Sequence, residues 1–208
     1  MARQKRRLVI VGNADLPQDL SGQIDSADFV LRFNRPRFIG GWGGTKTDCL
    51  MMCNSGKPMQ EKLKDNSFVA EEFFRQAGQI VLVYHPYIMK TYFRQPSFSS
   101  KVLKHRRLDW TDEAIRIFGE AGKDVVIKSA QFYLDACAEI GIKGKALSEW
   151  FPSTGYLGIW DCLKHFDLSQ WDLYLCGFTW QGWKHHNWSS EEQWVRARIS
   201  EGTCHFLC

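Results

Sequence analysis

Two adjacent histidines, His185 and His186, are the side chains of this sequence best suited to move a proton. Glu191 follows His186 by five positions, in a segment that also holds Trp180, Trp183, Trp188 and Trp194. Imidazole titrates near neutral pH, so a histidine here could take a proton from a substrate hydroxyl group. A pair of histidines in a polar loop is also common on plain protein surfaces. The tryptophans either pack in a core, as we expect for Trp194, or stack on a sugar ring.

Two asparagines come directly after apolar runs of the kind that form buried strands. Gly12 and Asn13 follow residues 8–11, and Asn34 follows residues 28–33. Glycine lets a ligand approach the backbone closely, and an asparagine amide can donate a hydrogen bond to a phosphate oxygen. An ordinary turn after a strand, or an asparagine that simply ends one, would give the same pattern.

The sequence Pro-Ser-Thr-Gly at 152–155 leads into an apolar segment with helical spacing, residues 154–165. Unpaired backbone N–H groups at the start of a helix bind anions, and the hydroxyl groups of Ser153 and Thr154 could add hydrogen bonds. Simple capping of the helix by a hydroxyl group is the alternative explanation.

Apolar runs alternate with segments of helical spacing along the chain. We expect strands at residues 8–12, 28–33, 48–53, 80–84, 124–127 and 172–177, with 203–208 as a candidate to close the sheet. We expect helices at residues 111–121, 129–140, 154–165 and 189–201. Residues 61–77 also have some helical spacing, although Asn66 and Ser67 interrupt it. This alternation predicts an α/β fold of three α/β/α layers, Rossmann-like, with a mostly parallel sheet. Ligands of such sheets bind beyond the carboxyl ends of the strands. The length fits a single domain over residues 1–208.

In order and spacing, these segments resemble the animal-type sialyltransferases, glycosyltransferase family 29. V-G-N at 11–13, I-D-S-A-D-F-V-L-R-F-N-R at 24–35 and G-T-K-T-D at 44–48 are similar to the family's large motif. P-S-T-G at 152–155 and Y-L-C-G-F at 174–178 are similar to its small motif, and the spacing from His186 to Glu191 fits its very small motif. The resemblance covers most of the chain and implies the GT-A-like variant of the Rossmann-like fold.

The resemblance implies an inverting glycosyltransferase that moves sialic acid, or Kdo, from a CMP-sugar to a hydroxyl group of a glycan or glycolipid acceptor. His186 is then the general base, and Glu191 supports its helix instead of reacting. Carried over by position, the donor site consists of Gly12, Asn13, Asn34, Ser153, Thr154 and Gly155. The family's short histidine- and tyrosine-rich motif has little room here, because His186 lies only eight residues after Phe178. His185 is therefore the candidate for that motif's contact to the phosphate.

Composition and missing patterns narrow the expected partners. No Asp-x-Asp triplet is present, so we expect no metal and no cofactor beyond the CMP-sugar co-substrate. A formal net charge of +4 suits an anionic small molecule and argues against a nucleic-acid partner. No apolar run approaches the roughly 20 residues that span a bilayer, so we expect a cytoplasmic protein with at most peripheral membrane association.

The seven cysteines include no Cys-x-x-Cys pair, which favours a reducing compartment over a disulfide framework. Cys204, His205 and Cys208 could bind zinc, but no second ligand pair has matching spacing, so buried cysteines are the simpler expectation.

Two other functions fit parts of the pattern. A nucleotide-binding protein of the same fold without transferase activity would keep the asparagines and the Pro-Ser-Thr-Gly turn, while His186 would be dispensable. A dinucleotide-dependent oxidoreductase is disfavoured, because the G-x-G-x-x-G fingerprint is absent. A purely structural partner-binding domain would not explain four polar clusters at strand and helix ends.

Overall fold

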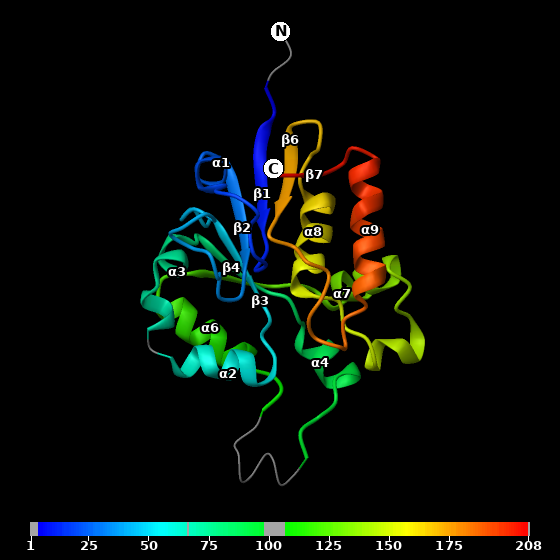
Figure 1. Ribbon diagram of the computed structural model, residues 1–208. Helices are drawn as coiled ribbons and strands as arrows, with labels where there is room; N and C mark the ends of the chain where they lie inside the picture. The colour runs from blue at the N-terminus through cyan, green and yellow to red at the C-terminus, as the bar shows by residue number, and fades with distance from the viewer. Residues whose placement is uncertain (1–3, 66, 98–106, 208) are drawn as a thin grey trace.

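The computed structural model describes residues 4–65, 67–97 and 107–207 as an α/β fold built on one parallel sheet (Figure 1). The strand order is β5-β4-β3-β2-β1-β6-β7, and every neighbouring pair is parallel. The strands are β1 (Arg6–Val11), β2 (Phe29–Phe33), β3 (Cys49–Met52), β4 (Gln79–Leu82), β5 (Asp124–Ile127), β6 (Trp171–Cys176) and β7 (His205–Phe206). All the expected strands are present, and β7 closes the edge beside β6 as the candidate segment predicted.

The helices cover both faces of the sheet, which confirms the three-layer prediction (Figure 1). One face carries α4 (Pro86–Tyr92), α7 (Ala130–Glu139), α8 (Thr154–His165) and α9 (Trp188–Ser200). The other face carries α1 (Ser21–Asp25), α2 (Gly56–Lys64), α3 (Glu72–Gln76) and α6 (Thr111–Glu120), together with the short 3-10 helix η1 (Phe68–Ala70). A second 3-10 helix, η2 (Gly144–Ser148), precedes α8.

Burial on both faces explains why the strands are continuous apolar runs. In β1, Leu8 and Ile10 pack under α8, whereas Val9 and Val11 pack under α1, and none of the four is more than 3% exposed. A strand of a parallel sheet therefore shows no alternation of apolar and polar residues.

Residues 61–77, where helical spacing with an interruption was expected, fall into α2, η1 and α3. Ser67 lies between α2 and η1 as the interruption predicted, and Asn66 lies outside the described residues. Phe68, Phe73 and Phe74 all contact one another or Phe118 of α6. In one straight helix, residues 68 and 73 would point about 140° apart. Breaking the helix brings the three rings into one cluster.

Two short helices, α1 and α4, had no periodic signal in the sequence because each is only five or seven residues long. α4 begins with Pro86 in its first turn, and the ring of His85 accepts a hydrogen bond from the backbone N–H of Tyr87. A proline at this position is typical of a helix start.

The strand order reverses at β1, since β2 to β5 lie on one side of it and β6 and β7 on the other. At such a point the connections leave in opposite directions and open a crevice at the carboxyl ends of the two central strands. The loops after β1 and β6 therefore border the expected ligand position. None of the helices in the described residues combines the length and the apolar character that crossing a bilayer requires.

Candidate functional site

A pocket of about 340 Å³ opens where the strand order reverses, at the carboxyl ends of β1, β2 and β6. Its walls come from the loops after these strands, the start of α8 and the loop before α9. Seven of the nine predicted site residues line it: Gly12, Asn13, Asn34, Ser153, Thr154, Gly155 and His186. Glu191 lies behind Ser153, and His185 lines a neighbouring pocket. Segments more than 150 residues apart in the chain thus form one site.

Gly12 is required by the packing of the loops after β1 and β6. A Cβ atom at Gly12 would lie 2.1 Å from the carbonyl oxygen of Gly177, so any side chain there would displace the backbone. The loops are joined by hydrogen bonds from Gly12 N–H to the Cys176 carbonyl (2.8 Å) and from Ala14 N–H to the Gly177 carbonyl (2.9 Å). The group that approaches Gly12 closely is therefore the protein's own backbone, and the expected approach by a ligand stays a prediction.

The two asparagines are held by backbone groups that fix their amide orientation. Asn34 adopts a positive φ of 54°, which asparagine tolerates better than most residues, and its Oδ1 accepts from Cys53 N–H at 3.0 Å. Asn13 Oδ1 accepts from Arg37 N–H at 3.2 Å, and its Nδ2 donates to the Phe33 carbonyl at 3.0 Å. Since both oxygens are engaged by N–H groups, a ligand can take hydrogen bonds from Nδ2 of Asn34 and from the second N–H of Asn13 Nδ2, whose first N–H donates to Phe33.

Ser153 caps α8, as the alternative explanation of the Pro-Ser-Thr-Gly turn predicted. Its Oγ accepts from Tyr156 N–H at 3.1 Å and donates to Glu191 Oε2 at 2.6 Å. The single hydroxyl proton of Ser153 is therefore used inside the protein. Among the described residues, the backbone N–H groups of Thr154 and Gly155 have no assigned partner, as expected for the first turn of a helix. Such groups at the start of a helix can bind an anion, so binding of a donor phosphate at this end of α8 stays a prediction.

Glu191 connects the first turn of α9 to the start of α8. The side chain is fully buried, and its Oε1 accepts from Ser153 N–H at 2.8 Å while its Oε2 accepts from the Ser153 hydroxyl group at 2.6 Å. Burial raises the pKa of Glu191 to about 7, although the two hydrogen bonds from Ser153 act in the opposite direction. Glu191 therefore holds the first turn of α8 in place from behind and does not line either pocket.

The ring of His186 is oriented by a backbone carbonyl. Its Nδ1 lies 2.6 Å from the carbonyl oxygen of Phe151. A carbonyl oxygen can only accept, so Nδ1 carries the proton and Nε2 keeps a lone pair. The ring packs edge-on against Trp183 and Trp188, with centroids 5.0 and 4.8 Å away. Burial lowers the pKa of His186, the bond to Phe151 raises it and His185 lowers it further, so the net result favours the neutral ring.

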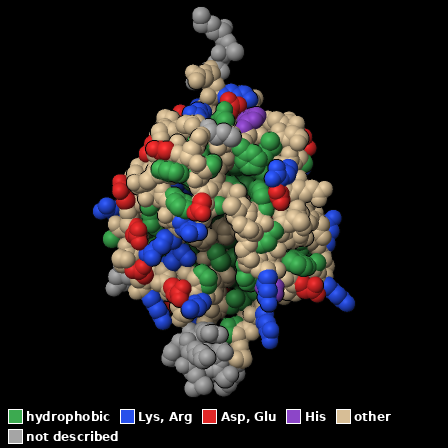
Figure 2. All heavy atoms as spheres, in the orientation of Figure 1, with side chains coloured by type: hydrophobic (Ala, Val, Ile, Leu, Met, Phe, Trp, Pro, Cys, Tyr) green, Lys and Arg blue, Asp and Glu red, His purple; other side chains and the backbone are tan. Residues whose placement is uncertain are grey.

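A second pocket of about 1170 Å³ adjoins the first, and both are lined by Asn34, Thr154 and His186. His186 therefore stands at the boundary of two cavities. Figure 2 shows the surface hollowed in the middle of this face of the molecule, with hydrophobic side chains along the hollow. His185 lines the larger pocket, with its ring 4.8 Å from that of Trp183, and it does not line the smaller one. Its expected contact to a donor phosphate stays a prediction.

The nearby tryptophans divide between core and surface. Trp194 packs against the core, as expected, and its indole N–H donates to Glu139. Trp180 stacks on Phe178, and both line the smaller pocket, whereas Trp183 is 54% exposed. Phe178 also lies over Gly155, where a Cβ atom would be 2.9 Å from its ring.

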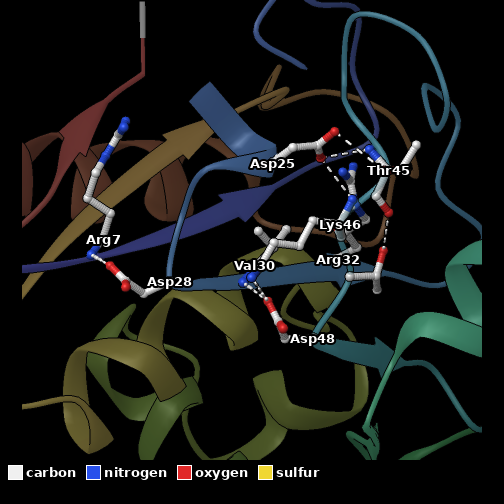
Figure 3. Close-up of polar contacts among 9 residues, drawn as sticks. Arg7, Asp25, Asp28, Val30, Arg32, Thr45, Lys46 and Asp48 are labelled. Carbon is white, nitrogen blue, oxygen red and sulfur yellow. Dashed lines mark hydrogen bonds and ion pairs between the residues drawn. The ribbon is translucent and has the colours of Figure 1, made fainter. Parts of the chain in front are cut away.

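The sequence analysis assigned no role to Arg32, which organises the long loop between β2 and β3 (Figure 3). Arg32 is 1% exposed, and its guanidinium donates to the carbonyl oxygens of Lys46 (2.9 Å) and Gly43. Burial lowers its pKa to about 10, although Cys176 and Asp25 act in the opposite direction. Asp25 accepts from the backbone N–H groups of Thr45 and Lys46, at 2.8 and 2.9 Å. An arginine inside an apolar run was the signal that could have revealed this role.

The cysteines of the described residues are unpaired, and no group of three or more His, Cys, Asp or Glu side chains in that part of the chain is placed to hold a metal ion. Cys204 is fully buried, as expected, and His205 is exposed. Cys208 lies outside the described residues.

Comparisons with known proteins give one sequence relative and a clear structural likeness. No family model matches the chain. It is 28% identical over 202 residues to a urease operon 23 kDa accessory protein of Rhizobium meliloti, covering 95% of this chain and 90% of that protein. A mammalian sialyltransferase in complex with Gal-beta-1-3GalNAc-ortho-nitrophenol superposes with a TM-score of 0.60 and 20% identity, over 98% of this chain and 69% of that one. A variant of the sialyltransferase CST-II in complex with CMP superposes with a TM-score of 0.59 and 11% identity, over 98% of this chain and 81% of that one. The chain therefore has a sialyltransferase-like fold, a Rossmann-like variant of GT-A.

Proposed function

We propose that this protein is an inverting, metal-independent glycosyltransferase that moves sialic acid, or Kdo, from a CMP-sugar to a hydroxyl group of a glycan acceptor. The observation that carries the proposal is the position of His186. It stands where two pockets meet, and the Phe151 carbonyl fixes its tautomer so that Nε2 is the basic nitrogen. A base at this boundary can reach an acceptor in one cavity and a donor in the other.

The smaller pocket suits the phosphate end of the donor. The N–H groups of Thr154 and Gly155 and the amide nitrogens of Asn13 and Asn34 converge on it as neutral donors. Fixed donors aimed at a developing negative charge stabilise a departing phosphate without a metal ion, and Arg37 also lines this pocket. In this proposal the acceptor occupies the larger pocket.

The chemical step is one displacement. The acceptor hydroxyl oxygen attacks the anomeric carbon while the bond from that carbon to the phosphate oxygen breaks, and CMP leaves with the electron pair. The hydroxyl proton passes to Nε2 of His186. Attack from the face opposite the leaving group inverts the anomeric configuration.

Two structural neighbours support this proposal. One is a sialyltransferase in complex with CMP, and the other is a sialyltransferase in complex with Gal-beta-1-3GalNAc-ortho-nitrophenol. The relative from a urease operon favours a second candidate, a nucleotide-binding accessory protein of the same fold without transferase activity. In that candidate His186 is dispensable.

The two candidates differ in the effect of His186→Ala. CMP release from CMP-sialic acid and from CMP-Kdo is measured with a panel of glycan acceptors in the presence of EDTA. We expect transfer by the wild type, and a loss of about 10²-fold or more in His186→Ala, with CMP binding retained. The control is His165→Ala, which alters a histidine at the far end of α8. CMP binding without transfer from either donor would favour the accessory protein, and unchanged transfer in His186→Ala would remove the assigned base.

A further inference from the structure

The larger pocket contains a continuous strip of aromatic rings that runs from the sheet to the surface. Tyr84 lies 4.9 Å from Phe93, Phe93 lies 4.7 Å from Phe151, and Phe151 stacks on Trp183 at 5.8 Å between ring centroids. Tyr84 is 5% exposed at the inner end, and Trp183 is 54% exposed at the outer end. All four rings line the pocket.

The outer end of the strip lies beside the proposed base. The Trp183 ring is 5.0 Å from the ring of His186, measured between centroids, so a ligand along the strip has one end at the reacting position. The cavity of about 1170 Å³ is more than three times as large as the neighbouring pocket of about 340 Å³. Its size and its rings suit a long apolar group in addition to a sugar.

The same walls carry an excess of positive charge. Lys62, Arg94 and Lys184 line the pocket, and Glu149 is the one acidic residue among the described residues that do so. Arg94 and Lys184 each directly follow a ring of the strip in the sequence. None of the three cations forms an ion pair with a described residue. An anionic group joined to an apolar chain would complement both features.

We infer that the acceptor is an acidic glycolipid, in which the sugar that presents the hydroxyl group is joined through a phosphate to a hydrocarbon chain. The sugar lies at His186, the phosphate at the cations and the chain along the aromatic strip. This inference rests on the proposed function, because it assigns the larger pocket to the acceptor.

A chain-length series tests the inference without a known acceptor sugar. Octyl, decyl and dodecyl phosphate, below their micelle concentrations, are titrated calorimetrically into the protein saturated with CMP. Burial of each added methylene should lower Kd roughly three- to fourfold. Inorganic phosphate should bind far more weakly than any of the three. Equal Kd values along the series, or displacement of CMP by the alkyl phosphates, would overturn the inference.

Two substitutions locate the binding. Trp183→Ala should weaken dodecyl phosphate binding about tenfold, while Trp42→Ala, at an equally exposed tryptophan that does not line the pocket, should leave it unchanged. Lys184→Gln should weaken it roughly two- to fivefold, and Lys145→Gln should not. Equal effects of Trp183→Ala and Trp42→Ala would contradict the assignment.

The same measurements distinguish a failure of the proposed function from a failure of the glycolipid inference. If CMP does not bind but the chain-length dependence and the Trp183 effect persist in its absence, the pocket binds acidic lipids and the transferase proposal is wrong. If CMP binds and transfer occurs but the series is flat, the transferase stands and the glycolipid inference is wrong.

Discussion

Glu191→Gln removes a fully buried carboxyl group that the folded protein keeps protonated to a higher pH than the unfolded chain does. Burial raises the pKa of Glu191 to about 7 from its ordinary value of 4.5, and the hydrogen bonds from Ser153 offset this only in part. Glutamine has nearly the same shape and can still accept from the Ser153 N–H, but it does not titrate. The substitution therefore isolates the effect of the charge.

The sign follows from proton linkage. A carboxyl group whose pKa is raised by folding adds stability that is fully present below the unfolded value of 4.5 and is lost as the pH rises through 7. The two values differ by about 2.5, and at about 1.36 kcal/mol per pH unit this corresponds to about 3 kcal/mol. We expect the stability of the wild type, relative to that of Glu191→Gln, to fall by about this amount between pH 4.5 and pH 8.

Urea unfolding followed by circular dichroism at several pH values in this range measures the difference. Glu192→Gln, the neighbouring residue in an ion pair with Arg196, is the matched control and should change little with pH. A difference between wild type and Glu191→Gln that stays constant from pH 4.5 to pH 8 would refute the argument from burial.

Three other outcomes follow from the contacts of the site. Arg32→Met leaves two buried loop carbonyls without their donor, so we expect a loss of about 2 to 4 kcal/mol in urea unfolding, and an unchanged midpoint would contradict this. Gly12→Ala places a Cβ atom 2.1 Å from the Gly177 carbonyl and should lower both stability and CMP affinity. Gly22→Ala, with nothing within 4 Å of the added atom, should be neutral or stabilising. Because burial lowers the pKa of His186, kcat/KM should stay level down to pH 6.5 and fall only below it; a decline that begins above 6.5 would argue against His186 as the base.

Strands β1 to β4 could be predicted because they are buried on both faces, so that a continuous apolar run was the expected signal. The edge strands β5 and β7 are more exposed. The helices could be predicted only where they are long. The segment around Phe68, Phe73 and Phe74 has helical composition, but contacts with Phe118 of another helix break it into three pieces. Contacts of this kind join residues far apart in the chain and leave no local pattern.

The site could be predicted in part, because the topology brings strand ends together. Asn13 and Asn34 follow neighbouring strands, and the start of α8 meets them at the point where the strand order reverses. The bond between Ser153 and Glu191 spans 38 residues and had no signal of its own. It changes the role of Ser153, since a hydroxyl group bound to Glu191 cannot also donate to a ligand.

The larger pocket could not be predicted from spacing. Its four rings come from the loop after β4, the end of α4, the segment before α8 and the loop before α9. Each aromatic residue alone is equally typical of a core. Only the folded arrangement shows that they form one strip that ends at His186.

Selective binding of CMP tests the central claim most directly. The purified protein is titrated calorimetrically with CMP, and with UDP and NAD as controls, in the presence of EDTA. The account predicts saturable binding of CMP, at least about tenfold tighter than that of UDP or NAD, and weaker binding in Asn34→Ala. No binding of CMP, or equal binding of all three nucleotides, would contradict it.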